Sequence, residues 1–196
     1  MTGTTFTQIA GWSALINGIT SIASTITLIL MFTVAGFFGP INDAISVIWV
    51  LAFIPLAILF YQMHQPINPS LALIAAVVGI AAMMVFAVAQ MLLVLRVVSF
   101  EQSVGLILLM GAIIGFWALL NGFLARSVQT LPSAMIWLLI IFGASFILTA
   151  VGWNAAGQQH PLVMIGFLIG AIAGPIWAIW LGRMLLIANL GFGIAD

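Results

Sequence analysis

Residues 70–95 read SLALIAAVVGIAAMMVFAVAQMLLVL, and this segment decides the class of fold. It contains no charged residue, and Gln90 is the one amide side chain within it. At a rise of about 1.5 Å per residue, a helix of this length spans the ~30 Å hydrocarbon core of a bilayer. Because lipid cannot satisfy backbone hydrogen bonds, the segment is predicted to cross a membrane as an α-helix.

Similar apolar runs extend on both sides of this segment. The other five cover residues 9–38, 44–61, 103–125, 133–153 and 162–187. The composition agrees, with 65% hydrophobic and 3% charged residues, whereas roughly a quarter of the residues in a soluble domain are charged. We therefore predict an all-α polytopic membrane protein whose six transmembrane helices form one bundle over residues 1–196.

The breaks between the runs are rich in Pro, Asn and Ser, which favour turns and helix starts. Asn42 or Asp43 is predicted to cap the second span, and Ser70 is predicted to cap the third. All connections are short, so spans that follow one another in the sequence are expected to be antiparallel neighbours.

The few charges fall outside the middle of the runs. Arg126 and Arg183 follow the fourth and sixth spans, whereas Asp43, Arg96 and Glu101 fall on the opposite side. The positive-inside rule then favours cytoplasmic termini. We expect an integral protein of the cell (inner) membrane, with the side chains of Arg126 and Arg183 extending to lipid headgroups.

Two of the spans share a pattern. Residues 111–122 read GAIIGFWALLNG and residues 170–182 read GAIAGPIWAIWLG, so one inserted proline aligns them. One interpretation is three repeated helical hairpins around an axis along the membrane normal. The other is chance, because Gly, Ala, Ile and Leu dominate the chain.

Glycines recur every fourth position on the same two spans, at Gly111, Gly115, Gly166, Gly170 and Gly174. Small residues at this spacing let another backbone approach closely. They predict tight helix packing within the bundle; the alternative is self-association as a homo-oligomer or within a larger membrane complex.

Uncharged polar and aromatic side chains are the remaining features inside the spans. They predict either interhelical hydrogen bonds or a partly polar cavity for a lipophilic ligand. The candidate lining residues are Asn17, Ser21, Gln90, Trp117, Asn121 and Trp177. The tryptophans could stack on a flat molecule such as a quinone or carotenoid, although core packing is the simpler use.

Several kinds of chemistry lack the residues they need. The chain has no cysteine or lysine, which leaves no thiolate ligand and no retinal Schiff base. His64 and His160 are predicted to lie in loops on opposite faces, so they could not hold one haem together. No His, Asp or Glu cluster has metal-ligand spacing. The chain is therefore predicted to be neither an enzyme nor a metal or nucleic-acid binder.

Residues 174–183, GPIWAIWLGR, resemble the closing segment of small bacterial six-span membrane proteins of unknown function. That resemblance implies a six-helix fold in a bacterial inner membrane and brings no catalytic residues with it. Our leading functional hypothesis is a non-enzymatic accessory subunit or a binder of a lipid, quinone or carotenoid. The alternative is a transporter or channel for a small neutral or amphiphilic solute.

Overall fold

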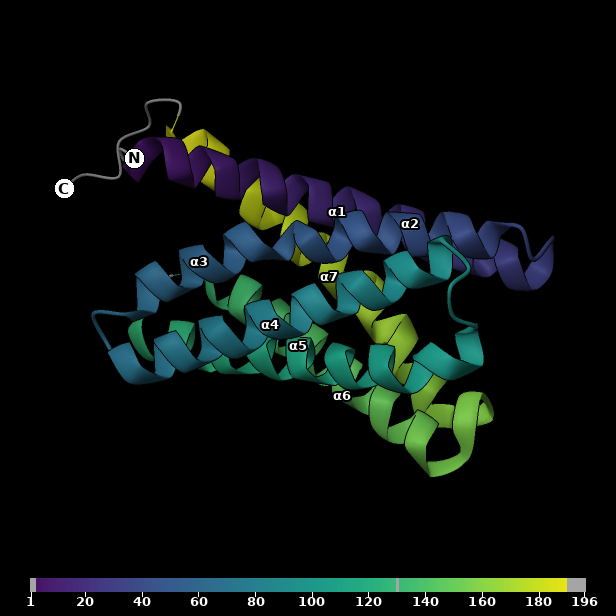
Figure 1. Ribbon diagram of the computed structural model, residues 1–196. Helices are drawn as coiled ribbons and strands as arrows, with labels where there is room; N and C mark the ends of the chain where they lie inside the picture. Colours follow the sequence, from purple (N-terminus) through teal and green to yellow (C-terminus); the bar gives the residue numbers. More distant parts are fainter. Residues whose placement is uncertain (1–2, 130, 190–196) are drawn as a thin grey trace.

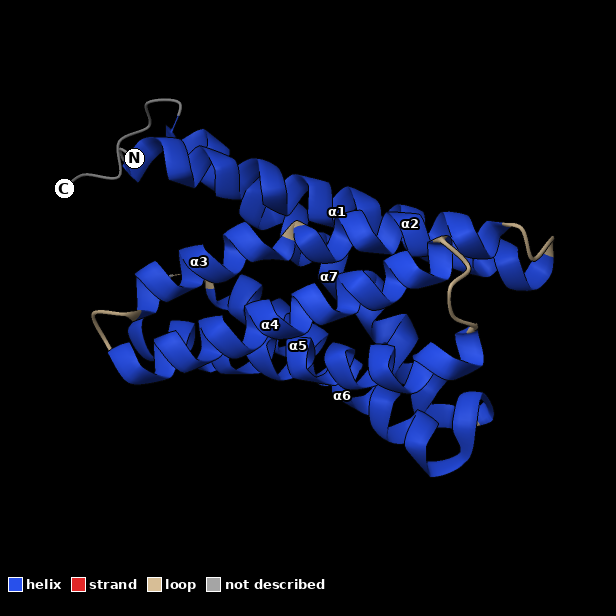
Figure 2. Cartoon of the chain, in the orientation of Figure 1, coloured by secondary structure: helices blue, strands red, loops and turns tan. Residues whose placement is uncertain are grey.

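The computed structural model describes residues 3–129 and 131–189, and every regular element in these ranges is a helix (Figure 2). The elements are α1 (Gly3–Thr33), α2 (Phe38–Leu51), α3 (Phe53–His64), α4 (Pro69–Val94), α5 (Phe100–Val128), α6 (Ser133–Ala156), the short 3₁₀ helix η1 (Gly157–Gln159) and α7 (Pro161–Asn189). Helices α2 and α3 together form one span, which makes six stretches long and apolar enough to cross a membrane. The predicted all-α, six-span fold is confirmed, and the chain is an integral membrane protein by architecture.

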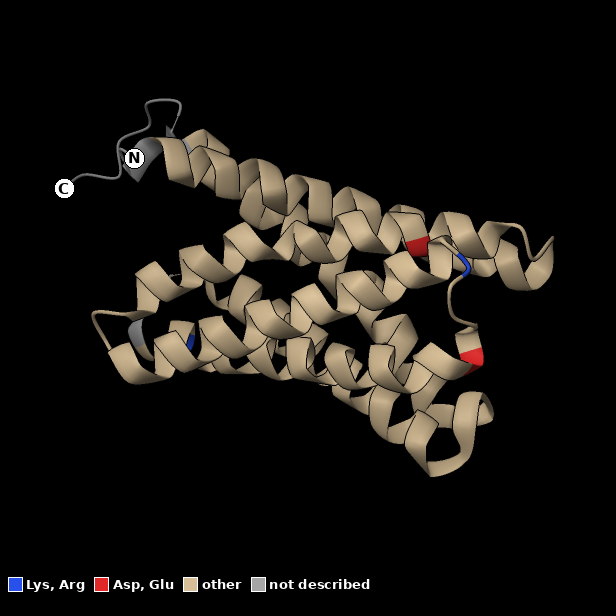
Figure 3. Ribbon diagram, viewed as in Figure 1, with Lys and Arg blue, Asp and Glu red and all other residues tan. Residues whose placement is uncertain are grey.

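The six spans form a closed ring in sequence order (Figure 1). Each span packs against the spans before and after it, and α7 returns to pack against α1. The connections are short, so successive spans run antiparallel. One end of the ring therefore carries the starts of α2, α5 and α7, and Asp43 and Glu101, the acidic residues of the described ranges, lie at this end (Figure 3).

The start of the second span differs from the prediction. Helix α2 begins at Phe38, a residue assigned to the first span, and its N-cap Phe37 makes no side-chain capping bond. Both predicted caps, Asn42 and Asp43, lie inside the helix. There the Asn42 Oδ1 accepts hydrogen bonds from Ser24 (2.7 Å) and Thr27 (3.3 Å) of α1. Asn42 therefore joins two helices instead of capping one.

The third span also has a different cap from the one predicted. Asn68, not Ser70, caps α4 by accepting a hydrogen bond from the Leu71 backbone N–H at 3.0 Å. Pro69 then occupies the first helical position, where its missing N–H costs nothing. Helix α5 begins with a capping box, in which Ser99 and Gln102 satisfy one another's backbone N–H groups.

The second span is interrupted at Ala52, between α2 and α3. Pro55 explains the position of the break, because a proline has no N–H for the carbonyl four residues earlier and its ring clashes with that carbonyl. The carbonyl in question belongs to Leu51, the last residue of α2. Asn17 of α1 donates its amide N–H to the nearby Trp49 carbonyl at 2.9 Å, which fastens the interrupted span to α1.

Aromatic side chains fill the centre of the ring around Phe53, which is 1% exposed. We call Trp49, Phe53, Phe60, Trp117, Phe142 and Trp177 the central aromatic cluster. The ring of Phe53 lies 5.1 Å from that of Trp49 and 5.8 Å from those of Trp117 and Phe142. Contacts of this kind add about 0.5–1.5 kcal/mol per pair beyond the area they bury.

Glycines set the distances between neighbouring spans. A Cβ atom at Gly115 of α5 would lie 2.6 Å from the Gly143 carbonyl oxygen of α6, so these two backbones are in direct contact. On α7, a Cβ at Gly166 would meet the backbone of α6 at 2.6 Å. Gly170 and Gly174 face Ser145 and Phe142 of α6 in the same way, so the glycines of α5 and α7 pack on opposite sides of one helix.

Helix α7 changes partner along its length. Its second half packs against α1, where a Cβ at Gly18 would lie 3.3 Å from the Pro175 carbonyl oxygen, and one at Gly182 would lie 2.8 Å from that of Gly11. Its first half packs against α6, whose Gly152 abuts the backbone of Val163. Helices α1 and α7 therefore cross near Gly18 and diverge beyond it, toward the end where α7 begins (Figure 1).

Candidate ligand-binding cavity

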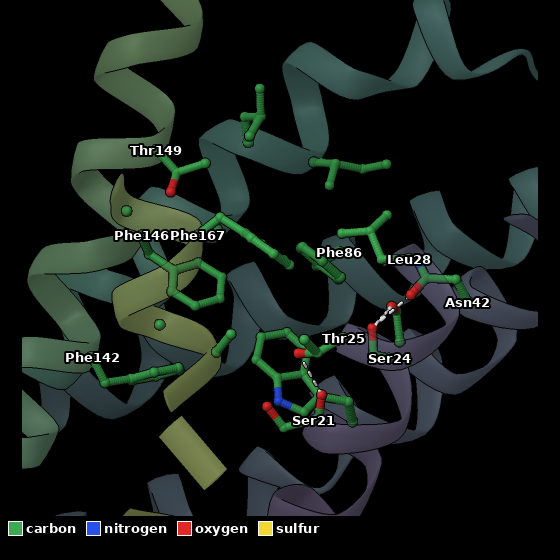
Figure 4. Close-up of a pocket in the computed structure, with 18 residues that line it drawn as sticks. Ser21, Ser24, Thr25, Leu28, Asn42, Phe86, Phe142, Phe146, Thr149 and Phe167 are labelled. Carbon is green, nitrogen blue, oxygen red and sulfur yellow. Dashed lines mark hydrogen bonds between the residues drawn. The ribbon is translucent and has the colours of Figure 1, made fainter. Parts of the chain in front are cut away.

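A cavity of about 260 Å³ lies inside the ring, in the half where α1 and α7 diverge. All the spans contribute to its wall (Figure 4). The lining residues are Ser21, Ser24, Thr25, Leu28, Asn42, Ser46, Trp49, Phe86, Ile107, Leu108, Gly111, Phe142, Phe146, Thr149, Gly166, Phe167, Gly170 and Ala171. None of these side chains is ionisable, so the cavity presents an uncharged surface.

One wall of the cavity is polar. Ser21, Ser24 and Thr25 of α1 face Asn42 and Ser46 of α2. Their sequence spacing places the α1 residues on one helical face. The Ser24 hydroxyl donates to Asn42 at 2.7 Å and lies 3.3 Å from the Ser46 hydroxyl, so this wall is a connected hydrogen-bond network.

The opposite wall is aromatic. Figure 4 shows Phe142 and Phe146 on α6, with Phe167 of α7 projecting between Phe146 and Phe86. The floor is Trp49, whose ring stacks on Phe146 at 5.7 Å. A bound molecule would therefore meet aromatic rings on one side and hydroxyl groups on the other.

Small residues create the space. Gly111, Gly166, Gly170 and Ala171 line the cavity from α5 and α7. The glycines have no side chain to fill the volume between the surrounding rings. Gly166 and Gly170, which let α7 pack closely on α6, therefore also leave space for the cavity beside that contact.

The cavity is partly open rather than enclosed. Partly exposed lining residues occur on several helices: Thr25 and Leu28 on α1, Ile107 and Leu108 on α5, Phe146 and Thr149 on α6, and Phe167 and Ala171 on α7. Phe86 on α4, by contrast, is 6% exposed. The exposure of the lining is therefore spread over α1, α5, α6 and α7.

Of the residues predicted to line a cavity, Ser21 does so, whereas the other five do not line this one. Asn17 is 1% exposed and donates to the Trp49 carbonyl, and Gln90 is 6% exposed on α4. Trp117, Asn121 and Trp177 lie in the other half of the ring. These five residues are buried in the packed part of the bundle, outside the cavity. Their polarity and their positions in the sequence could not show whether they line a cavity or pack between helices.

His64 was predicted to lie in a loop, and this prediction is wrong. It ends α3, is completely buried, and its Nδ1 lies 3.1 Å from Asn121 Oδ1. The Asn121 amide N–H donates to the Trp117 carbonyl at 2.8 Å, so Oδ1 must be the acceptor and His64 Nδ1 the donor. This network assigns the tautomer. It leaves Nε2 as a buried lone pair without a partner in the described chain.

The predicted aromatic ligand surfaces at Trp117 and Trp177 pack against protein side chains instead. Both indole rings contact Phe53 and Phe60, at centroid distances between 5.8 and 6.3 Å. The two tryptophans, 2% and 0% exposed, thus occupy similar positions around the same two rings.

The two arginines predicted to contact lipid headgroups are both exposed. The Arg126 guanidinium lies over the Trp137 ring of α6, 5.0 Å from its centroid. Arg183 follows Gly182 on α7, at the same end of the bundle. Within the described residues, no group of three or more His, Cys, Asp or Glu could hold a metal ion.

The fold and the cavity define the class as a polytopic α-helical membrane protein with an uncharged, partly open internal cavity. No family model, curated protein or solved structure matches the chain. The similarity of residues 174–183 to small bacterial six-span proteins thus stays a prediction.

Proposed function

We propose that this protein binds a lipophilic or amphiphilic molecule inside the bundle and acts without catalysing a reaction, alone or as an accessory subunit of a membrane complex. The cavity carries the proposal. It is built by all the spans, it combines aromatic with hydroxyl-bearing walls, and it is partly open. Ligand sites are typically concave and mostly apolar, with a few polar groups that set orientation.

The chemistry of the lining supports binding over catalysis. The cavity's hydroxyl groups could act as nucleophiles only beside a general base. Its lining residues include no histidine, carboxylate or other ionisable side chain. His64, the buried histidine, is bonded to Asn121 in the other half of the ring, beyond the central aromatic cluster.

The test is to purify the protein in mild detergent and identify co-purifying lipids, quinones and pigments by absorption spectroscopy and mass spectrometry. Ala171→Leu replaces a methyl group with an isobutyl group in the lining of the cavity. Ala81→Leu makes the same change on α4, where Ala81 is exposed and does not line the cavity. We expect one small lipophile near a 1:1 ratio with the wild type and with Ala81→Leu, and at least tenfold less with Ala171→Leu. Equal amounts in all three proteins would contradict the proposal.

The bend of the second span at Pro55 favours one alternative, a transporter for a small neutral or amphiphilic solute. Proline removes a backbone hydrogen bond and bends a helix, and Ala52 keeps right-handed helical dihedral angles at this bend (φ −66°, ψ −14°). The bend at Ala52 adjoins Trp49 and Phe53, which separate the cavity from the His64–Asn121 pair. Transport would require the aromatic cluster to part, so that solute could pass from one half of the ring to the other.

Because the chain has no cysteine, single cysteines report access to each half without background. Ser46→Cys would report on the cavity and Asn121→Cys on the other half. A binder predicts that a small thiol reagent labels Ser46→Cys alone in proteoliposomes. Labelling of both positions, dependent on added solute, would favour the transporter.

We further propose that the protein lies in a bacterial inner membrane with both termini in the cytoplasm. The support is the position of Arg126 and Arg183 at the end of the bundle where α1 begins. Fusions of a cytoplasm-active and a periplasm-active reporter to the C-terminus test the orientation. Activity of the periplasmic reporter alone would reverse it.

A further inference from the structure

We infer that the ligand of this cavity is an uncharged lipophile that bears a hydroxyl group, in the class of phenols, quinols and lipid alcohols. The inference rests on the proposed function, because it names what the same cavity would bind. Three features carry it: the state of the hydroxyl groups on the polar wall, the absence of charge in the lining, and the size and opening of the cavity.

Three of the cavity's hydroxyl groups on α1 and α2, those of Ser24, Thr25 and Ser46, already donate their protons within the protein. Ser24 donates to Asn42 Oδ1 at 2.7 Å. The Ser46 hydroxyl, 3.3 Å from that of Ser24, must then be the donor to it. Thr25 donates to the Ser21 carbonyl of its own helix at 3.0 Å. Each of these oxygens retains a lone pair that can accept a further hydrogen bond.

The fourth such hydroxyl lies across the cavity on α6. Thr149 donates to the Ser145 carbonyl at 2.9 Å. Acceptor lone pairs therefore lie on both sides of the cavity, and a ligand that donates a hydrogen bond would match them. The Ser21 hydroxyl can donate a hydrogen bond to the ligand. A hydroxyl group on the ligand can accept that bond and also donate one, whereas a carbonyl or ether on the ligand can only accept.

Charge is excluded by the rest of the lining. Transfer of an ionised group into an apolar site without a partner is very costly, and none of the 18 lining residues is ionisable. Phe86, Phe146 and Phe167 instead offer ring surfaces to the ligand body (Figure 4). Flat or unsaturated groups fit between such rings by offset or edge-on contact.

The volume limits how much of the ligand is enclosed. A cavity of about 150 Å³ can hold benzene, so one of about 260 Å³ accommodates one ring with a short substituent. A longer chain would extend beyond the cavity, because the cavity is partly open.

A matched pair of probes tests the inference: 4-propylphenol and its methyl ether, 4-propylanisole. The two have nearly the same size and shape, but only the phenol can donate a hydrogen bond. Binding to the detergent-purified protein would be measured as the concentration dependence of thermal stabilisation. One hydrogen bond corresponds to a roughly 2- to 10-fold difference in affinity, and we expect the phenol to bind more tightly by that factor.

Two threonines of α1 supply the variants. Thr25→Val removes an acceptor on the cavity wall. Thr20→Val is the control, because the Thr20 hydroxyl also bonds to its own helix, at 2.7 Å to the Ile16 carbonyl, but does not line the cavity. We expect Thr25→Val to reduce the preference for the phenol and Thr20→Val to leave it unchanged.

The outcomes separate this inference from the function on which it rests. Equal affinity for phenol and ether, with both lost in Ala171→Leu, would overturn the hydroxyl assignment and keep a lipophile-binding cavity. Failure of both probes to bind the wild type, together with no co-purifying lipophile, would overturn both. A preference for the phenol that Thr20→Val and Thr25→Val reduce equally would also overturn the assignment.

Discussion

The contact between α5 and α6 is the most sharply testable part of the packing. Helix α5 carries four glycines, and three of them lie in surroundings of graded tightness. A Cβ at Gly105 would meet nothing within 4 Å, one at Gly111 would lie 3.2 Å from the Phe146 ring, and one at Gly115 would lie 2.6 Å from the Gly143 carbonyl oxygen. Alanine at these three positions therefore forms a graded series on one helix.

The magnitude follows from the Gly115 distances. For Gly115→Ala to reach the shortest ordinary contact, 3.4 Å, the facing backbone must move by roughly 0.8 Å. That backbone cannot rotate away as a flexible side chain could, so the helices must separate. Overpacking of this kind costs about 1–3 kcal/mol, and 1 kcal/mol corresponds to about 2–4 °C in the melting temperature of a chain of this size. We expect Gly115→Ala to lower the apparent Tm by roughly 2–12 °C.

The assay is thermal unfolding of the detergent-solubilised protein, followed by tryptophan fluorescence and by recovery of the monodisperse peak after heating. Gly105→Ala should leave Tm unchanged or raise it, because alanine favours a helix over glycine by up to about 1 kcal/mol. Gly111→Ala should fall between the two. If Gly115→Ala and Gly105→Ala melted at the same temperature, the two backbones could not lie as close as described.

Two further predictions concern the opposite half of the ring. His64→Leu and Asn121→Leu should each lower Tm, and the double variant should lose less than their sum, by a coupling of about 0.6–1.7 kcal/mol; strict additivity would rule out the hydrogen bond. Arg126→Gln should lower Tm by no more than about 1–4 °C, since an exposed cation–π contact is worth about 0.5–1 kcal/mol. When Trp137 is already replaced by Leu, Arg126→Gln should lower Tm no further. An equal loss of Tm in that background would show that the contact between Arg126 and Trp137 is not its cause.

The number and identity of the spans could be predicted because each apolar run is long and the charges avoid their interiors. The ends were harder to predict. Pro40 suggested a turn, yet it lies in the first turn of α2, where a proline is tolerated. The Asn68-Pro69 pair offered a cap followed by a proline at the first helical position, and this signal pointed to the observed start of α4 more directly than Ser70 did.

His64 could have been assigned correctly from helical spacing. Phe53, Leu56, Phe60 and His64 recur at three- and four-residue intervals, and all are buried on one face of α3. Extending that face by one turn places His64 inside the bundle. Its partner Asn121 was recognisable as an interior polar residue, but pairing the two requires knowledge of how α3 and α5 face one another.

The cavity itself could be predicted only in part. Ser21 was recognisable as a polar residue inside the first span and as a candidate for the cavity lining. The aromatic wall was not, because nothing in the sequence distinguishes Phe146 and Phe167 from other apolar residues of their spans. The volume depends on the divergence of two helices, which is a property of the assembled ring and not of any one segment.

That divergence follows from where the small residues lie. Gly11 and Gly18 bring α1 against the second half of α7, and Gly166 with Gly152 brings α6 against its first half. A helix that crosses its neighbour at an angle stays close to it only near the crossing. Because α7 crosses α1 near Gly18 and its first half follows α6, a wedge forms between α7 and α1, and the cavity lies beside this wedge. Filling the glycines of the crossing should thus alter the cavity without changing any residue that lines it.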